Sequence, residues 1–479
     1  MVFSSLLFLF YFLAPVILLY ALVPKKHKNL LLFIVSLLFY AWGEPRYIFL
    51  MLFSAVFNYL FGFIINKNKS KIALAVNIVV NIGLLVVFKY SDFFISTVNA
   101  VIRTNFPLLQ LALPIGISFY TFQALSYCID VYRGKTKVQK HFVSFGLYLA
   151  FFPQLIAGPI VRYDDIANQL HNHPQKVNMF AEGVQRFCVG LGKKVLIANN
   201  LGQLWELTAA TTGRSMLCAW LGIIAYTMQI YYDFSGYSDM AIGLGKMFGF
   251  ELCENFNYPY TAKSITDFWR RWHISLSSWF KEYVYIPLGG SHIEASRYEK
   301  TTRIGSISLT PDKKAQLRKD FNIFVVWMLT GLWHGASFNF VAWGIYYGVL
   351  LIVEKKFLKK KLEKLPSVLQ TIYTMLIVMI GWVLFANLDF GVAFAYIGSM
   401  LNITNIGFTD SIFWFRFFSY WLVLIAAILG CTPKTKEFFL MLTKYKLYWL
   451  RPVLSFVVLV VCIAYLVDST YNPFLYFRF

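Results

Sequence analysis

The sequence predicts an all-α fold, a polytopic transmembrane helical bundle of about eleven spans with one or two additional interfacial or re-entrant helices. Of its 479 residues, 58% are hydrophobic and only 14% are charged, and the mean hydropathy is +0.59. Apolar runs recur from Phe3 onward, and about 20 such residues cross a bilayer. Basic residues gather at the ends of these runs, so the net charge of +21 reflects the positive-inside bias and does not indicate a nucleic-acid partner.

The N-terminal part alternates regularly between apolar runs and basic loops. The first run, Phe3 to Val23, has no basic leader and no small-residue cleavage site, so we expect a retained helix and not a signal peptide. Three lysines in residues 24–29 place that loop in the cytoplasm and the N-terminus outside. The basic loops at 67–71 and 133–140 return to the same side after further spans.

The middle of the chain is less regular. An apolar run from Phe142 to Ala157 ends at a predicted break, Gly158-Pro159. The segment 180–204 carries several charges and is tilted, interfacial or packed inside the bundle. Leu217 to Phe234 is a good span, and it runs into a stretch in which Asp233 and Asp239 flank a predicted glycine break.

Residues Ile265 to Glu282 have the pattern of an amphipathic helix that lies in an interface. At 100° per residue its aromatic side chains fall on one arc, with His273 at the edge. The opposite face carries Arg270, Arg271, Ser275, Ser278 and Lys281. The longest polar segment, Ser291 to Asp320, follows and is predicted to be a basic cytoplasmic loop.

A single histidine, His334, lies inside an uncharged stretch that begins at Phe321 and ends at Glu354. This stretch predicts two helices that meet near His334 and Gly335. A helix from Lys319 to His334 rises roughly 20 Å, which puts the imidazole at membrane depth. An ionisable side chain there is a functional-site hypothesis by default.

The last third resumes the alternation. A lysine cluster at 355–364 is cytoplasmic, and the spans 371–386, 412–430 and 453–467 lead to an extracytoplasmic tail, Asp468 to Phe479. We find no repeats or soluble segments and assign residues 1–479 to one membrane domain. The six scattered cysteines form no CxxC pair, which indicates small buried hydrophobes, neither disulfides nor a metal site.

Candidate chemistry therefore rests on polar residues inside the membrane, since nucleotide-binding, metalloprotease and serine-hydrolase motifs are absent from the sequence. His334 is either a structural hydrogen-bonder between helices or a general base that takes a proton from a hydroxyl as it attacks an acyl carbon. His273 is either an interfacial histidine in contact with water or a second catalytic or orienting group.

The other candidates are polar or aromatic, and the polar ones have both a structural and a functional interpretation. Asp233, Asp239 and Asn339 either orient an imidazole or a substrate, or make structural polar contacts. Trp333 and Trp343 are candidates to line a cavity. Tyr476, in the aromatic tail, is either part of an interfacial anchor or a hydroxyl that receives an acyl group and passes it on.

Several motifs occur in order along the chain and together resemble the membrane-bound O-acyltransferase family, in its alginate O-acetyltransferase-like bacterial branch. They begin at Leu113, Phe152, Asp233, Asp267, Tyr283, Gly331 and Asn472, and read LPIGISFYTF, FPQLIAGPI, DFSGYSD, DFWRRWHI, YVYIPLGG, GLWHGAS and NPFLYFRF.

The resemblance implies a helical fold with a central tunnel or funnel, His334 at the catalytic position and His273 as the second important histidine. It implies that an acyl group leaves a cytoplasmic thioester and ends on a polysaccharide hydroxyl outside, directly or through an extracytoplasmic acetyltransferase partner. We expect acetyl-coenzyme A as donor, with its phosphates near the basic inner loops, no metal, and a multi-pass location in the bacterial cytoplasmic (inner) membrane.

Two alternatives stay open at this point. Within the same family, the reaction would be D-alanyl transfer from a carrier protein to teichoic acid. In a different class, the protein would be a transporter whose polar residues line a path for an intact solute.

Overall fold

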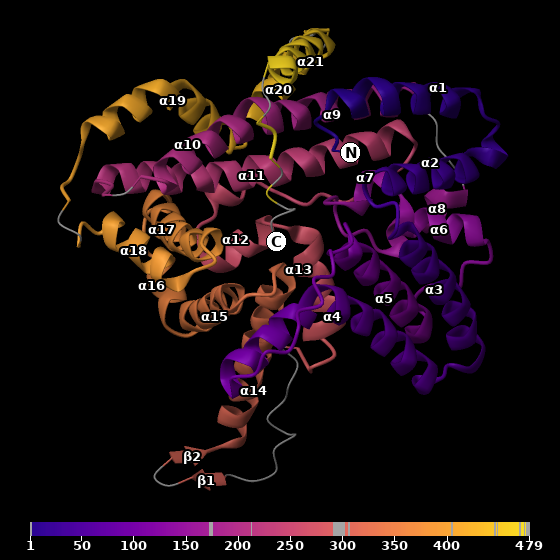
Figure 1. Ribbon diagram of the computed structural model, residues 1–479, viewed down its shortest axis with the longest axis horizontal. Helices are drawn as coiled ribbons and strands as arrows, with labels where there is room; N and C mark the ends of the chain where they lie inside the picture. Colours follow the sequence, from indigo (N-terminus) through magenta and orange to yellow (C-terminus); the bar gives the residue numbers. More distant parts are fainter. Residues whose placement is uncertain are drawn as a thin grey trace. The chain divides into compact units, whose positions relative to one another are not determined.

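The computed structural model describes residues 2–171, 176–211, 213–290, 302–304, 307–403, 406–444, 447, 449–468, 471–473 and 475. These residues are mainly helical, with one short pair of strands (Figure 1). The chain forms two compact units, and each is described by itself. The first unit contains Met1–Glu206, Met228–Asn255 and Tyr420–Phe479, and the second contains Leu207–Thr227 and Phe256–Ser419. The assignment of 1–479 to a single domain stays a prediction.

The first unit opens with a π-helical turn, Leu7–Leu13, that continues into α1. Its elements are α1 (Ala14–Leu22), a 3-10 turn (Lys25–His27), α2 (Lys28–Gly43), α3 (Ile48–Asn68), α4 (Lys71–Ile102), α5 (Ile117–Arg133), α6 (Phe142–Ala150), α7 (Phe152–Leu155), α8 (Tyr163–His171), α9 (Val177–Gly192), a π-helical turn (Lys193–Ala198), most of α10 (Asn199–Ala209), the second half of α11 (Met216–Met247), the end of α19 (Ser411–Gly430), α20 (Lys434–Lys444) and α21 (Leu450–Asp468).

The second unit contains the remainder of α10, α11 and α19. Its own elements are a 3-10 turn (Pro259–Thr261), α12 (Ile265–Arg271), α13 (Ile274–Phe280), a π-helical turn (Lys281–Tyr285), β1 (Thr302–Ile304), β2 (Ile307–Leu309), α14 (Pro311–His334), α15 (Phe338–Val353), a π-helical turn (Glu354–Leu358), α16 (Lys359–Leu362), α17 (Ser367–Ala386) and α18 (Phe390–Met400). Strands β1 and β2 pair antiparallel, with Arg303 opposite Ser308, at the N-terminal end of α14 (Figure 1).

Five helices within the described residues are long and apolar enough to cross a membrane: α3, α4, α17, α19 and α21. Only 11% of the most apolar window of α19 and 6% of that of α21 is buried within the protein. Such long apolar surfaces need lipid around them, so the structure supports a membrane protein. The finer count of about eleven spans, and the central tunnel, stay predictions.

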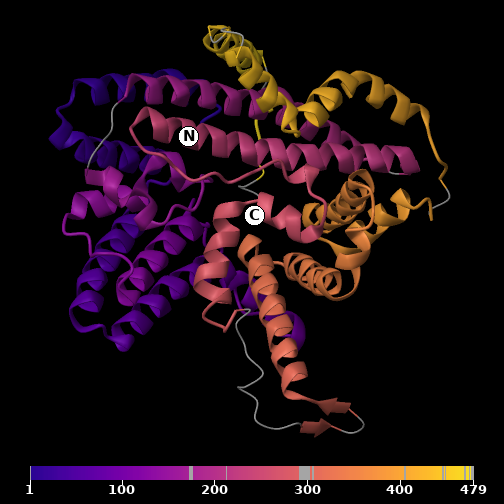
Figure 2. The ribbon, with the colours of Figure 1, turned by 180° about the vertical axis from the view of Figure 1, so that it is seen from behind.

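Glycines bring α9 and the second half of α11 into backbone contact in the first unit (Figure 1, Figure 2). A Cβ on Gly190 would lie 2.5 Å from the carbonyl oxygen of Gly236, and one on Gly183 would lie 2.6 Å from that of Gly243. Close approach of this kind is what small residues provide between membrane helices. The predicted glycine break between Asp233 and Asp239 is wrong, because α11 runs unbroken through Gly236 and uses this glycine for packing.

The predicted helix 142–157 is also interrupted earlier than expected. Helix α6 ends at Ala150, and Phe151 leaves the helical conformation with ψ at 108°. Pro153 lies in the first turn of α7, where its missing N–H costs no hydrogen bond, whereas in a helix interior it would. The break therefore comes before Pro153 and not only at Gly158-Pro159.

The predicted loop 291–320 ends ten residues sooner than expected. Thr310 caps α14, its hydroxyl accepting a hydrogen bond from the Lys313 amide, and Pro311 occupies the first helical position. The segment 311–320 is therefore helical and carries part of the predicted loop's basic charge. Residues 291–301, 305 and 306 of that loop lie outside the described residues.

Candidate functional site

The turn between α14 and α15 places His334 as the last residue of a helix, as the sequence predicts. Gly335 is extended, and the Ser337 hydroxyl caps α15 by accepting a hydrogen bond from the Asn339 amide. The two helices touch through glycines: a Cβ on Gly331 would lie 2.2 Å from the Phe340 carbonyl oxygen, and one on Gly344 would lie 2.3 Å from that of Trp327. Only glycine permits this approach, which fixes the position of the imidazole.

Three aromatic rings surround the half-buried imidazole of His334. Its ring centroid lies 4.9 Å from that of Trp333, 5.1 Å from that of Trp343 and 5.2 Å from that of Phe385, each nearly edge-on. These rings come from α14, α15 and α17, so three helices converge on one histidine. The surroundings are apolar, which strengthens electrostatic interactions made by the imidazole.

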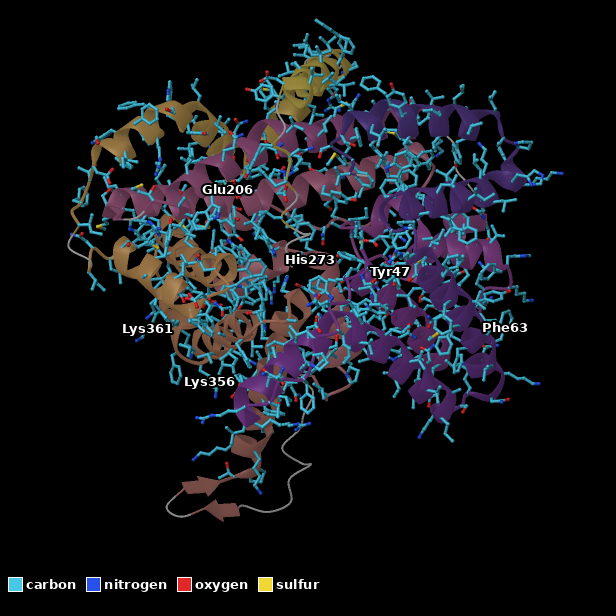
Figure 3. The ribbon with its side chains drawn as sticks, viewed as in Figure 1. Tyr47, Phe63, Glu206, His273, Lys356 and Lys361 are labelled. Carbon is cyan, nitrogen blue, oxygen red and sulfur yellow. The ribbon has the colours of Figure 1, made fainter. Side chains whose placement is uncertain are left out.

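His273 lies in the same cluster of rings. Its centroid is 5.9 Å from that of Trp333, so this buried indole contacts both imidazoles. The cluster continues through the rings of Trp269, Trp272, Trp327, Trp343, Tyr347, Trp382 and Phe385. The structure therefore brings together the two histidines that the sequence singles out; Figure 3 labels His273.

The backbone at His273 differs from the prediction of one continuous helix over 265–282. Helix α12 ends at Arg271 and α13 begins at Ile274, with His273 between them in the left-handed region at φ 45° and ψ 54°. Histidine is among the residues that adopt positive φ more readily, but it still costs about 1 kcal/mol or more there. Ser275, predicted to face away from the apolar side, is also buried. The predicted continuous helix is therefore wrong, because the chain kinks at His273. The division into two faces holds apart from Ser275, since the aromatic side is buried whereas Arg270 and Lys281 are exposed.

His273 is only 2% exposed. This burial lowers the pKa of His273 from 6.5 to about 3. The imidazole is therefore neutral near pH 7, with one ring nitrogen as donor and the other as acceptor.

Glu354, at the end of α15, anchors α12 and was not predicted as a site residue. Its buried carboxylate accepts hydrogen bonds from the amides of Ile265 at 2.7 Å and Thr266 at 3.1 Å, and from the Thr266 hydroxyl at 2.6 Å. A carboxylate at a helix N-terminus is favourable because the free amides and the helix dipole point at it. In the sequence Glu354 stands out only as an acid at the head of a run of lysines, which does not predict its contact with α12.

The profile of the membrane-bound O-acyltransferase family matches residues 4–303. The chain belongs to this family. A probable alginate O-acetylase of Pseudomonas aeruginosa is 42% identical over 411 residues, which cover 84% of this chain and 75% of the relative. A peptidoglycan O-acetyltransferase of Helicobacter pylori is 33% identical over 446 residues, 85% of this chain and 81% of the relative. A teichoic acid D-alanyltransferase of Bacillus subtilis is 27% identical over 287 residues, 58% of this chain and 69% of the relative.

Membership in the O-acyltransferase family confirms that the chain is a membrane-bound acyltransferase, so we set the transporter alternative aside. The whole profile match lies before the turn at His334, since it ends at residue 303. The roles of His334, Trp333 and His273 in this O-acyltransferase stay predictions that rest on the geometry described above.

The remaining candidates make polar contacts. Asn339 is buried in α15, and its amide donates to the Asn387 carbonyl at 2.7 Å, which joins α15 to the end of α17. Asp239, in the first unit, pairs with Arg186 at 2.8 Å and with Lys193 at 2.7 Å. These contacts match the structural interpretation of both residues.

Asp233 pairs with Lys194 in the interior of the first unit. The Asp233 Oδ1 and Lys194 Nζ atoms are 2.5 Å apart, and both side chains are only 3% exposed. Lys194 therefore packs inside the first unit, which favours the packed alternative for this part of the segment 180–204. Asp233 also accepts a hydrogen bond from the Leu475 amide at 2.9 Å, and Lys194 donates to the Pro473 carbonyl.

The residues just before Tyr476 are therefore bound to a buried ion pair, while Tyr476 itself lies outside the described residues. Asn472 reinforces the attachment, since its amide donates to the Ser4 carbonyl at 2.6 Å. The tail that carries this candidate is held against the N-terminus of the chain. Among the described residues, no His, Cys, Asp or Glu side chains gather in groups of three that would hold a metal ion.

Proposed function

We propose that this acyltransferase passes an acetyl group from a cytoplasmic thioester across the bacterial cytoplasmic membrane, for O-acetylation of an exported or cell-surface polysaccharide. The observation that carries the proposal is the convergence of His334 and His273 on Trp333 within one aromatic cluster. The alginate and peptidoglycan relatives support the acceptor class, because both names specify O-acetylation of a glycan.

His334 is the proposed general base. Its imidazole accepts the proton of an attacking hydroxyl while the oxygen bonds to the thioester carbonyl carbon. The carbon–sulfur bond then breaks, and the imidazolium returns the proton to the leaving thiolate. Positioned acid–base groups of this kind contribute about 10²- to 10⁴-fold in rate. The rings of Trp343 and Phe385 keep the imidazole in one orientation and exclude water.

His273 is the proposed positioning residue. Its neutral ring lies against Trp333, and Trp333 lies against His334, so a change at His273 reaches the base through one indole. A neutral imidazole also avoids placing a second positive charge beside the base as it becomes protonated.

The second half of the proposal concerns the C-terminal tail, Asp468 to Phe479. The Tyr476 hydroxyl receives the acyl group and delivers it on the extracytoplasmic side, to the polysaccharide or to an acetyltransferase partner there. Anchoring of Asn472, Pro473 and Leu475 by Ser4, Lys194 and Asp233 supports this idea, because an acyl carrier must be held at a defined place.

The test is acyl transfer from radiolabelled acetyl-coenzyme A by purified protein in liposomes. We expect His334→Ala to reduce transfer by about 100-fold or more, with normal insertion and size-exclusion behaviour. Leu329→Ala, which trims an exposed side chain of the same helix, is the matched control and should retain activity. Full activity in His334→Ala would remove this residue from the mechanism.

D-alanyl transfer is the second candidate, and the Bacillus subtilis relative is the observation that favours it. The donor distinguishes the two reactions. If wild-type protein leaves acetyl-coenzyme A intact but consumes a D-alanyl thioester on a carrier protein, the second candidate replaces the first.

A further inference from the structure

A cavity of about 590 Å³ in the first unit is lined by an unusual set of side chains. Three lysines and three histidines contribute to its wall, and among the described residues no Asp or Glu does. The six basic residues are Lys25, Lys26, His27, Lys140, His141 and His171. Its volume lies in the range of roughly 300–1,000 Å³ that is common for small-molecule sites.

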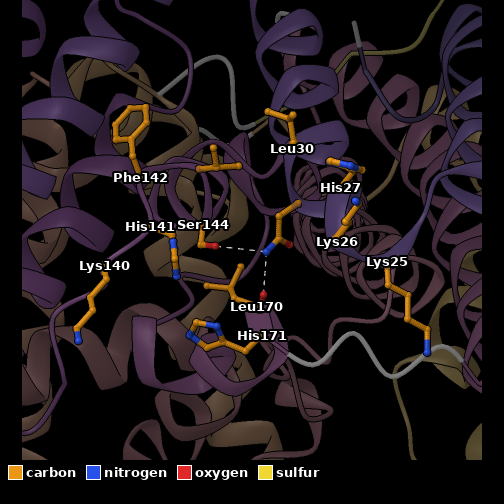
Figure 4. A pocket seen from close by; sticks show the side chains of 12 residues that line it. Lys25, Lys26, His27, Leu30, Lys140, His141, Phe142, Ser144, Leu170 and His171 are labelled. Carbon is orange, nitrogen blue, oxygen red and sulfur yellow. Dashed lines mark hydrogen bonds between the residues drawn. The ribbon is translucent and has the colours of Figure 1, made fainter.

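Three segments far apart in the sequence build this cavity. They are the 3-10 turn Lys25–His27, the start of α6 and the end of α8. Asn29 ties them together at the floor, because its amide donates to the Leu170 carbonyl at 2.8 Å and to the Ser144 hydroxyl at 3.3 Å (Figure 4). Ser144 and Leu170 are buried, whereas the basic side chains are exposed at the rim.

Residues outside the cavity also hold the backbone at its rim. The His141 amide donates to the Gln139 side chain at 2.9 Å, and that side chain donates to the Tyr163 hydroxyl at 2.7 Å. The Tyr59 hydroxyl donates to the Lys140 carbonyl at 2.7 Å. The backbone that presents Lys140 and His141 is therefore fixed before any ligand binds, which lowers the entropic cost of binding.

The lysines of the cavity are not used for packing or pairing. Lys28, in the same loop, is buried with its ammonium 4.3 Å from the centre of the Tyr20 ring. Lys25, Lys26 and Lys140 are instead exposed, and none of them forms an ion pair with another described residue. A general positive-inside bias would scatter such charges along the loops, whereas here they line one concavity, with Lys25 and Lys140 on opposite sides of it (Figure 4).

We infer that this cavity is a binding site for a phosphate-bearing anion. Lysine is a strong phosphate binder, and imidazole and amide N–H groups add donors that a phosphate's oxygens accept. Helix α6 begins at this cavity, and its N-cap residue His141 provides no side-chain cap for the first-turn amides. A monoanionic carboxylate would leave most of these donors unused, whereas a phosphate mono- or diester group engages several at once.

Two sources supply this chemistry, and binding measurements separate them. The first is the phosphates of coenzyme A, measured as coenzyme A binding to detergent-purified protein by isothermal titration calorimetry. The second is an anionic lipid headgroup, measured by native mass spectrometry as phosphatidylglycerol retained in preference to phosphatidylcholine. Neither measurement needs acyl transfer, so the result is independent of the proposed function.

The test variant is Lys25→Gln/Lys140→Gln, which removes one charge from each side of the cavity. The control is Lys67→Gln/Lys137→Gln, which removes two exposed lysines from basic loops without touching the cavity. We expect the test variant to weaken one of the two ligands by about tenfold or more, since hydrogen bonds to charged groups are strong, and the control to change neither. Both variants must elute and melt like the wild type.

The two arms give distinct answers. Weaker coenzyme A binding assigns the cavity to the acyl donor, and lost phosphatidylglycerol retention assigns it to a lipid. If the test variant and the control behave alike in both measurements, the cavity binds no phosphate and the inference is overturned.

Discussion

His273 combines three features rarely found together: a left-handed backbone, nearly complete burial and contact with a second candidate residue through Trp333. Strain at a buried polar residue persists only when its surroundings hold it there, and such residues cluster at functional sites. The sequence marks His273 as important but cannot show this, because one residue's φ depends on the packing of α12 and α13 against the rest of the unit.

The low pKa of His273 makes the stability of the protein depend on pH. The folded state keeps the imidazole neutral down to about pH 3, whereas the unfolded chain binds a proton near 6.5. Stability is therefore full above pH 6.5 and declines as the pH falls below it. From pH 6.5 to pH 5 the loss is about 2 kcal/mol for this one group.

Replacing His273 with asparagine tests this account, because asparagine also tolerates positive φ. Thermal melts of wild type and His273→Asn at pH 7.5 and pH 5 should show a smaller acid-induced shift for the variant. An equal shift in both proteins would mean that His273 does not titrate as proposed. If His273 acts through Trp333 as proposed, kcat should fall more than KM rises.

Glu354 is the second residue whose role is visible only in the structure. Glu354→Gln keeps the shape but removes the charge that holds the amides of Ile265 and Thr266, so we expect a loss of about 2 kcal/mol in stability. Because α12 carries Trp269 and leads to His273, acyl transfer should fall as well. Glu363→Gln, an exposed acid in the turn after α16, is the control and should behave like the wild type in melts and in transfer. A Glu354→Gln protein with unchanged stability would show that the cap is not needed.

At the scale of elements, the contact between α14 and α15 depends on glycines. A Cβ at Gly331 would meet the Phe340 backbone, which has no flexible end to move aside. Gly331→Ala should therefore separate the helices, displace His334, cost about 2 kcal/mol in stability and reduce transfer. Gly83→Ala, in the interior of α4, has nothing within 4 Å of the added carbon and should be neutral or slightly stabilising. Equal behaviour of the two variants in melts and transfer assays would contradict the packing argument.

The elements also show how far the sequence alone leads. The uncharged stretch and Gly335 predict the helix pair around His334, because both signals are local. The break at His273 and the cap of α12 by Glu354 could not be predicted. The cap joins Glu354 to Thr266, and these residues are about ninety positions apart in the sequence. A glycine in the sequence can likewise mean a helix break or a close helix contact. Gly236 suggests a break within α11, but in the structure it allows the backbone of α9 to pack against α11.

At the scale of the whole molecule, the two ends of the chain are joined. Asn472 binds Ser4, and the adjoining residues bind the buried pair of Lys194 and Asp233. No sequence feature of the N-terminal run or of the tail predicts that these two segments are in contact. The sequence predicts a structural polar contact as one interpretation of Asp233, but it does not identify Lys194 as the partner.

The buried pair separates a structural role of the tail from a functional one. Asp233→Asn alone leaves the Lys194 charge buried without its counterion, which should cost about 3 kcal/mol or more. Lys194→Met/Asp233→Asn removes both charges, so we expect stability to recover. It also removes the Lys194 contact to Pro473 and weakens the Asp233 contact to Leu475, so protease cleavage of a C-terminal epitope should be faster than in the wild type. If Tyr476 carries the acyl group, this stable double variant still transfers poorly. Full transfer with a mobile tail would instead mean that the tail serves only to anchor the chain.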